Sequence, residues 1–194
     1  MSRRTLALLV SLPAIACALV GLTHPVNLNM ASAEQWRNLH LILIPVFPLI
    51  GLAPWLIGRT AGVWFGRAGA LFGYGFATFY TALDILAGVA GGVLVIAGNS
   101  DATGSVFAIA RILANIGVVS LVAGCLVAGV AAFRVAGTAA LPGALLATVG
   151  AVLVQPGHIY LGLGTVAMML FAGGFVIMAF AVTRPAVLAD AQPA

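Results

Sequence analysis

The 194-residue sequence has no lysine and very little charge of either sign. All eight basic residues are arginine, four residues are acidic, and charged residues make up 6% of the chain, whereas soluble domains carry about 25%. With 63% hydrophobic residues and a mean hydropathy of +1.20, the composition excludes a soluble globular protein. The absence of lysine also excludes a retinal-type Schiff base.

Cysteine and recognisable catalytic motifs are also scarce. Cys17 and Cys125 lie inside apolar runs and form no C-x-x-C pair, which argues against a disulfide. The sequence shows no P-loop, no Rossmann glycine turn, no Ser-x-x-Lys and no nucleophile elbow. Enzymatic activity therefore has no motif to support it.

The apolar runs predict an all-α, polytopic transmembrane helix bundle that forms one integral membrane domain over residues 1–194. The third span, of about 31 residues, must tilt or project from the bilayer. The second contains Pro45, Pro48 and Pro54 and should be bent. The fifth is short, and a re-entrant segment is its alternative. The six predicted spans are 6–22, 39–57, 68–98, 105–133, 139–154 and 158–182.

The arginines indicate how the chain is threaded, because basic residues concentrate in cytoplasmic loops. The pattern places both termini in the cytoplasm. It indicates a multi-pass protein of a bacterial cytoplasmic membrane, with no nucleic-acid partner. Cleavage of the first span at a lipoprotein-like box, residues 14–17, is an alternative that would leave the later spans oriented as before. The arginines assigned inside are Arg3, Arg4, Arg59, Arg67, Arg134 and Arg184, against Arg37 and Arg111 outside or embedded.

Two local patterns predict where helices begin. Ser32 and Gln35 fit a capping box, so a helix should begin at Ala33 and run inward. Residues 155–157, Gln-Pro-Gly, predict a tight turn after which His158 opens the sixth span.

Glycine pairs on the third span predict close helix contacts. Gly69 and Gly73, and again Gly88 and Gly92, are four residues apart, a spacing that admits a neighbouring helix. That helix could belong to this chain, to a second copy or to another membrane protein. The expected partners are thus the lipid bilayer and such a protein.

Asp84 is the only acidic residue inside a long apolar run. A carboxyl group near the bilayer centre costs roughly 2.5–3.5 kcal/mol, so it should face the protein interior and have a partner. Counting back from the turn near residue 101 places Asn115, Thr81 or Tyr80 closer to it than Arg111. The alternatives are a neutral carboxyl hydrogen-bonded between helices, a proton- or cation-binding site, and a buried ion pair.

The three histidines all belong to the outer side in this threading. If the second and sixth spans are adjacent, His40 and His158 could meet and ligate a b-type haem. Addition of His24 or Glu34 could instead form a zinc or copper site. No H-x-x-x-H or H-E-x-x-H pattern supports either, and ordinary interfacial histidines are the competing interpretation.

Three functions remain open from the sequence. The first is a small transporter or ligand-binding membrane protein with a polar cavity that opens to the outer face, bounded by Asp84, Arg111, Asn115, His40 and His158. In it Asp84 is protonatable, and Arg111 either clamps an anionic group or reaches the lipid headgroups. The second is a membrane redox protein that holds haem or a metal through its histidines. The third is a non-catalytic subunit of a membrane complex.

Overall fold

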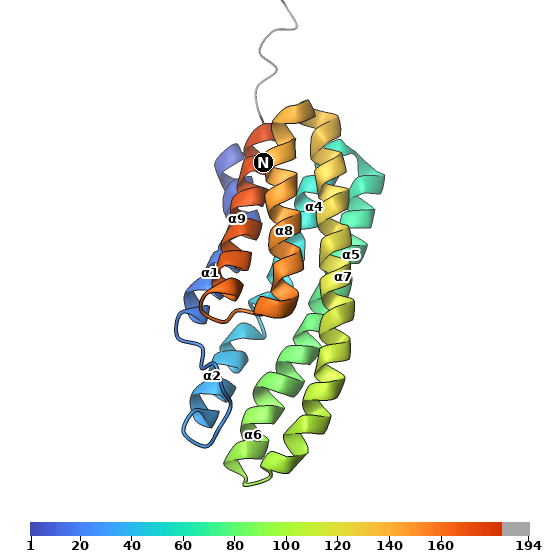
Figure 1. The fold of residues 1–194 in the computed structure, drawn as a ribbon. Helices are drawn as coiled ribbons and strands as arrows, with labels where there is room; N and C mark the ends of the chain where they lie inside the picture. The colour runs from blue at the N-terminus through green and yellow to red at the C-terminus, as the bar shows by residue number, and fades with distance from the viewer. Residues whose placement is uncertain (184–194) are drawn as a thin grey trace, which may run out of the picture.

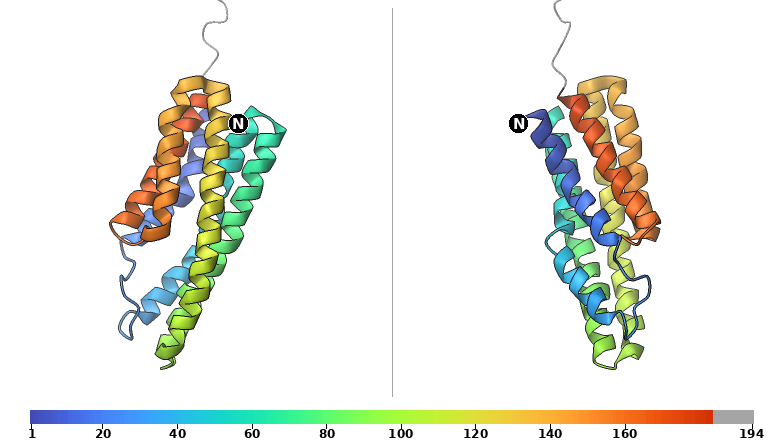
Figure 2. Two further views of the ribbon diagram at one scale, coloured as in Figure 1. Left: turned by 45° about the vertical axis from the view of Figure 1, so that its right-hand side comes forward. Right: turned by 90° about the vertical axis from the view of Figure 1, so that its left-hand side faces the viewer.

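A computed structural model describes residues 1–183, and all regular structure in this range is helical. The long helices run side by side as an elongated bundle (Figures 1 and 2). Arg184, which the charge pattern assigns to the cytoplasm, lies outside the described residues. The principal helices are α1 (Arg3–Gly21), α2 (Ala33–Leu43), α3 (Phe47–Ile50), α4 (Leu52–Gly58), α5 (Val63–Leu83), the π-helix η2 (Asp84–Ala90), α6 (Gly91–Ile96), α7 (Thr103–Ala136), α8 (Leu141–Gly157) and α9 (Leu163–Val182).

Several helices are long and apolar enough to cross a membrane, as the composition predicts. Four stretches meet this criterion, or five if the bent pair that begins with α2 counts as one span. One of the four, Ser100–Gly157, contains both α7 and α8. The short 3-10 turn η4 (Gly137–Ala140) joins these two helices, which pack against each other. Helix length and composition are therefore consistent with a multi-pass membrane protein.

The bend predicted in the second apolar segment is confirmed. The segments Ala33–Leu43 and Phe47–Ala61 meet at 43° across a break of three residues that contains Pro45. Proline has no backbone N–H to continue the helical hydrogen bonds, and its ring clashes with the preceding turn. The bend separates α2 from α3 and α4, so the two halves pack on different parts of the bundle.

The glycine pairs of the third segment do contact neighbouring helices, and the neighbours belong to this chain. A Cβ atom added at Gly73 would overlap the Gly51 carbonyl, and one added at Gly69 would contact the Pro54 carbonyl at 2.5 Å. Farther along, Gly88 abuts the ring of His40. The absence of side chains at these glycines lets α2, α3 and α4 approach closely.

Three local predictions fail at helix ends. Ser32 makes no side-chain capping bond, although the helix does begin at Ala33. Its Oγ instead accepts the N–H of Asn29 and donates to the Asn27 carbonyl oxygen. Residues 155–157 are the last turn of α8 and not a separate turn, since Pro156 lies inside that helix. His158 consequently ends α8, and α9 begins only at Leu163.

The helices differ greatly in length. α7 has 34 residues and α8 has 17, which correspond to about 51 Å and about 26 Å at 1.5 Å per residue. A hydrocarbon core is about 30 Å thick. Figure 1 shows that α6 and the first part of α7 extend well past the turn between α8 and α9, with α2 beside them. The three histidines lie where these long and short helices diverge.

Candidate metal centre

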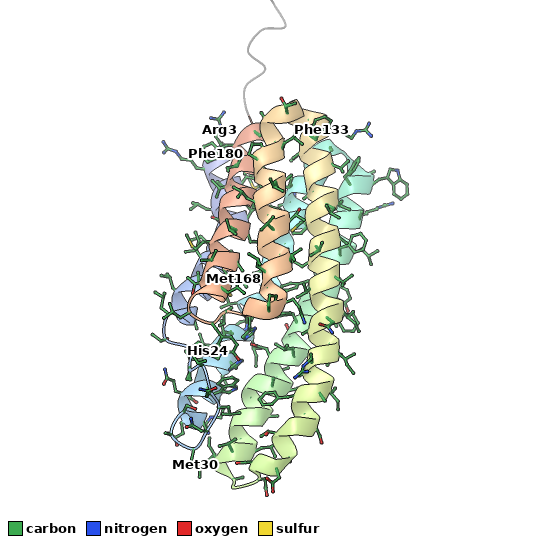
Figure 3. The ribbon with its side chains drawn as sticks, viewed as in Figure 1. Arg3, His24, Met30, Phe133, Met168 and Phe180 are labelled. Carbon is green, nitrogen blue, oxygen red and sulfur yellow. The ribbon has the colours of Figure 1, made fainter. Side chains whose placement is uncertain are left out.

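Three histidines from distant parts of the sequence meet at the ends of the short helices. His24 lies in the loop after α1, His40 on α2, and His158 at the C-terminal cap of α8. One ring nitrogen from each lies within 4.8 Å of those from the other two. Figure 3 shows His24 just beyond the turn that joins α8 and α9. These are all the histidines of the chain.

The His40 ring is held against the π-helix. The indole Nε1 of Trp36 donates to the Ala87 carbonyl oxygen at 3.0 Å, which fixes α2 on η2. At Gly88 the ring of His40 occupies the space that a side chain would take. π-Helical turns are rare and often occur at functional sites. The exposed fraction of His40 is only 1%.

His158 has an unusual backbone conformation. Its φ of 44° is the only positive φ of a non-glycine residue in residues 1–183. Left-handed conformations cost an ordinary L-residue about 1–2 kcal/mol, and such residues concentrate at functional sites. The ring shares a hydrogen bond of 2.7 Å with the buried hydroxyl group of Tyr80 through Nδ1. The strained cap therefore directs the imidazole towards α5 and the other histidines.

Backbone carbonyl groups fix the tautomers of His24 and His40. Nδ1 of His24 donates to the Pro25 carbonyl oxygen at 2.7 Å, and Nδ1 of His40 donates to the Trp36 carbonyl oxygen at 2.7 Å. Because a carbonyl group can only accept, each neutral ring carries its proton on Nδ1 and a lone pair on Nε2. The two Nε2 atoms face each other at 3.5 Å. Two lone pairs at this separation repel unless a cation lies between them.

Burial keeps the histidines that lie outside the helices in the neutral form. It lowers the pKa of His24, an effect that the hydrogen bond to Pro25 partly offsets. Burial also lowers the pKa of His158 well below its usual value, and His40 and His24 add to this effect. Metal ligation requires neutral imidazole. The site therefore presents nitrogen lone pairs near neutral pH.

The spacing of the ring nitrogens suits a single ion. Zinc–nitrogen bonds are about 2.0–2.1 Å long, so two nitrogens on one tetrahedral ion lie about 3.3 Å apart. The 3.5 Å between the Nε2 atoms of His24 and His40 is close to this value. Ligating histidines commonly donate their other ring N–H to a carbonyl group, as these two do. Small side-chain shifts would close the rest of the group around an ion.

A haem fits this group poorly. A porphyrin ligated by His40 and His158 would have to lie between their rings. Those two rings are stacked with their centroids only 5.9 Å apart, which leaves no room for a porphyrin. The ring of His24 packs beside both, with its centroid 5.0 Å from that of His40 and 5.7 Å from that of His158. Trp36 and Tyr160 pack against His24 with centroid distances of 4.8 Å each. The aromatic shell leaves the centre compact and suited to an ion.

Asp84 lies beside His40 and makes no hydrogen bond with any of the partners predicted for it. Its Oδ1 is 3.8 Å from Nε2 of His40, and the residue is 0% exposed. Neither carboxyl oxygen has a hydrogen-bond partner, and the same is true of the Thr81 hydroxyl group. The expected first partners Asn115 and Tyr80 bond to Gln155 and His158 instead. The neighbour of Asp84 thus comes from α2, which the hairpin count between the third and fourth segments could not reveal.

A cavity of about 410 Å³ adjoins the histidines. Its walls include His40, His158, Tyr80 and Arg111. Asp84 and Asn115, which the sequence analysis predicts to line the same cavity, do not line it. Arg111 is exposed and has no hydrogen bond or ion pair within residues 1–183. The fourth candidate ligand, Glu34, is an exposed residue of α2 outside the histidine group.

Comparisons of the chain with protein-family models, with curated proteins and with solved structures find no match.

Proposed function

We propose that this protein is a membrane protein that binds one zinc or copper ion through His24, His40 and His158. The observation that carries the proposal is the pair of Nε2 lone pairs that face each other at 3.5 Å, with both Nδ1 protons held by backbone carbonyl groups. Imidazole ligands suit zinc and copper, whereas magnesium and calcium prefer oxygen. An ion would remove the repulsion between the lone pairs.

The membrane placement that accompanies this proposal has six spans and both termini in the cytoplasm of a bacterial cell. The bias of arginine towards alternate loops supports it. With this threading the histidines lie on the outer side of the cytoplasmic membrane, where the chain leaves α1 and α8. In this placement the adjoining cavity would give the ion a route from the outer side.

A second candidate function is cation- or proton-coupled transport, favoured by the buried carboxyl group of Asp84 with its two unpaired oxygens. It ranks below metal binding because one titratable carboxyl group defines no substrate. Three convergent imidazoles, in contrast, define a ligand class. Abolished uptake of a tested solute by Asp84→Asn, with metal content unchanged, would favour the transporter.

Metal content tests the proposal directly. We expect the purified protein, loaded with Zn²⁺ and dialysed, to retain one ion per chain by mass spectrometry of the metal. His40→Gln should retain almost none, because it removes the central imidazole. Glu34→Gln is the matched control, since it removes the candidate ligand that lies outside the group, and it should bind like the wild type. Equal metal content in His40→Gln and the wild type would contradict the proposal.

Tyr80 provides a milder test. Tyr80→Phe removes the hydroxyl group that bonds His158 Nδ1 and preserves the buried ring. Loss of such a supporting hydrogen bond lowers metal affinity about 10–100-fold in other sites. We expect a weakening of this size in a competition titration against a zinc chelator, with one ion still bound at saturation. An unchanged affinity would show that the Tyr80 bond does not orient a ligand.

A further inference from the structure

We infer that Asp84 is a fourth ligand of the metal centre and completes a set of three imidazoles and one carboxylate for a divalent ion. This inference rests on the proposed function and identifies the class of ion that the site would select. It assigns a role to the one buried acidic side chain in residues 1–183.

The burial of Asp84 without hydrogen bonds is the first observation. Its exposed fraction is 0%, and both carboxyl oxygens lack a partner. Buried polar groups are normally hydrogen-bonded, and buried charges are paired or coordinate metals. The described residues offer Asp84 no arginine, since its only ion-pair contact is with His40. A cation at the histidines would supply the missing partner.

The position of Asp84 relative to His40 is the second observation. Nε2 of His40 has Oδ1 of Asp84 at 3.8 Å and Nε2 of His24 at 3.5 Å. Donor atoms on one tetrahedral ion are about 3.3 Å apart. An ion about 2 Å from His40 Nε2 would lie near both neighbours. Asp84 is outside the set of three ring nitrogens that lie within 4.8 Å of one another, so its side chain would have to move towards the ion to bind it. Asp84 is fully buried and does not line the cavity, whose walls include His40 and His158.

The local backbone explains why these two side chains face each other. Asp84 is the first residue of η2, and the next turn of that helix contains Ala87 and Gly88. Ala87 accepts the Trp36 indole bond, and Gly88 makes room for the His40 ring. The π-helix η2 thus carries the carboxyl group of Asp84 and also holds the imidazole of His40 beside it. The widened π-helical turn and the tightly packed helix α2 together position Asp84 and His40 next to each other.

The donor set predicts which ions bind. Carboxylate oxygen is a hard ligand, and Cu⁺ prefers sulfur. Neither cysteine belongs to the histidine group, although both are buried. Three imidazoles and a carboxylate favour a divalent ion of borderline hardness, such as Zn²⁺. Co²⁺ can replace Zn²⁺ as a spectroscopic probe. The negative charge of Asp84 would also balance half of the charge of the ion.

Asp84→Asn tests the inference, with Asp101→Asn as the matched control. Asp101 is exposed in the turn before α7 and should have no effect. We expect Asp84→Asn to weaken Zn²⁺ binding at least tenfold and to change the visible spectrum of bound Co²⁺. Zn²⁺ should also alter the infrared bands of carboxylate in the wild type and in Asp101→Asn, but not in Asp84→Asn. The chain has only four acidic residues, so these bands can be assigned.

The outcomes separate the two proposals. If the wild type binds neither Zn²⁺ nor Co²⁺, the metal centre itself is wrong. If the wild type and Asp84→Asn bind both ions with equal affinity and equal spectra, the histidine site stands and the assignment of Asp84 is overturned. A melting curve of each metal-free variant establishes that the fold is preserved.

Discussion

Saturation with Zn²⁺ is expected to raise the midpoint of thermal unfolding of the wild-type protein by several degrees. The three histidine ligands come from three segments, the loop after α1, helix α2 and the cap of α8, which separate when the chain unfolds. A ligand that binds only the folded state stabilises it by about 4 kcal/mol at a concentration 1,000 times its Kd. Because the ion joins these segments, most of this binding free energy should add to the free energy of unfolding and raise the midpoint temperature. Differential scanning fluorimetry in detergent measures it.

Two controls define this result. Mg²⁺ should produce no shift, because it prefers oxygen ligands and retains its water. His158→Gln should lose most of the Zn²⁺-dependent shift, and a chelator should reverse the shift in the wild type. Equal shifts with Zn²⁺ and Mg²⁺ would indicate a general ionic effect and would count against a specific site.

Gly88→Ala is expected to destabilise the protein and weaken metal binding together. The added Cβ would overlap Cβ, Cγ and Cδ2 of His40, atoms near the base of the side chain that cannot swing aside. Overpacking of this kind typically costs 1–3 kcal/mol. The displaced imidazole of His40 would also move away from Asp84 and His24, its neighbours in the site. Melting curves and a Zn²⁺ titration on the same preparation test both effects.

Gly173→Ala is the matched control for this variant. Gly173 lies inside α9, and a Cβ added there meets nothing within 4 Å. Alanine is favoured over glycine in a helix by up to about 1 kcal/mol, so this variant should be neutral or slightly stabilised and should bind Zn²⁺ normally. If Gly88→Ala behaves like Gly173→Ala, the close packing of η2 against His40 does not hold the site.

The sequence predicts the helical class and several details of the fold because these depend on local chemistry. Apolar runs give helices long enough to cross a membrane, and Pro45 lies at the observed bend. The spacing of Gly69 and Gly73 correctly indicates a close helix contact. The end of α8 is predicted wrongly because Pro156 and Gly157, which usually end helices, here remain inside one. The number of spans and their orientation stay predictions.

The candidate site is harder to predict because it depends on which helices pack together. The spacing along the third segment identifies Asp84 as a carboxyl group that needs a partner, but it does not name the neighbouring helix. The bend after α2 brings His40 to η2, and the strained cap of α8 turns His158 towards it. His24 reaches the group from a loop, where no periodicity applies. No short motif marks these three positions.

The unequal helix lengths determine from which side of the membrane the proposed ion would bind. Because α1 and α8 end and α9 begins beside the histidines while α6 and α7 continue, the group lies near one end of the short helices and not at their centre (Figure 3). A bound ion would exchange with a single aqueous compartment, through the cavity lined by Arg111. Such sidedness would suit a protein that captures or senses metal on one face of a membrane.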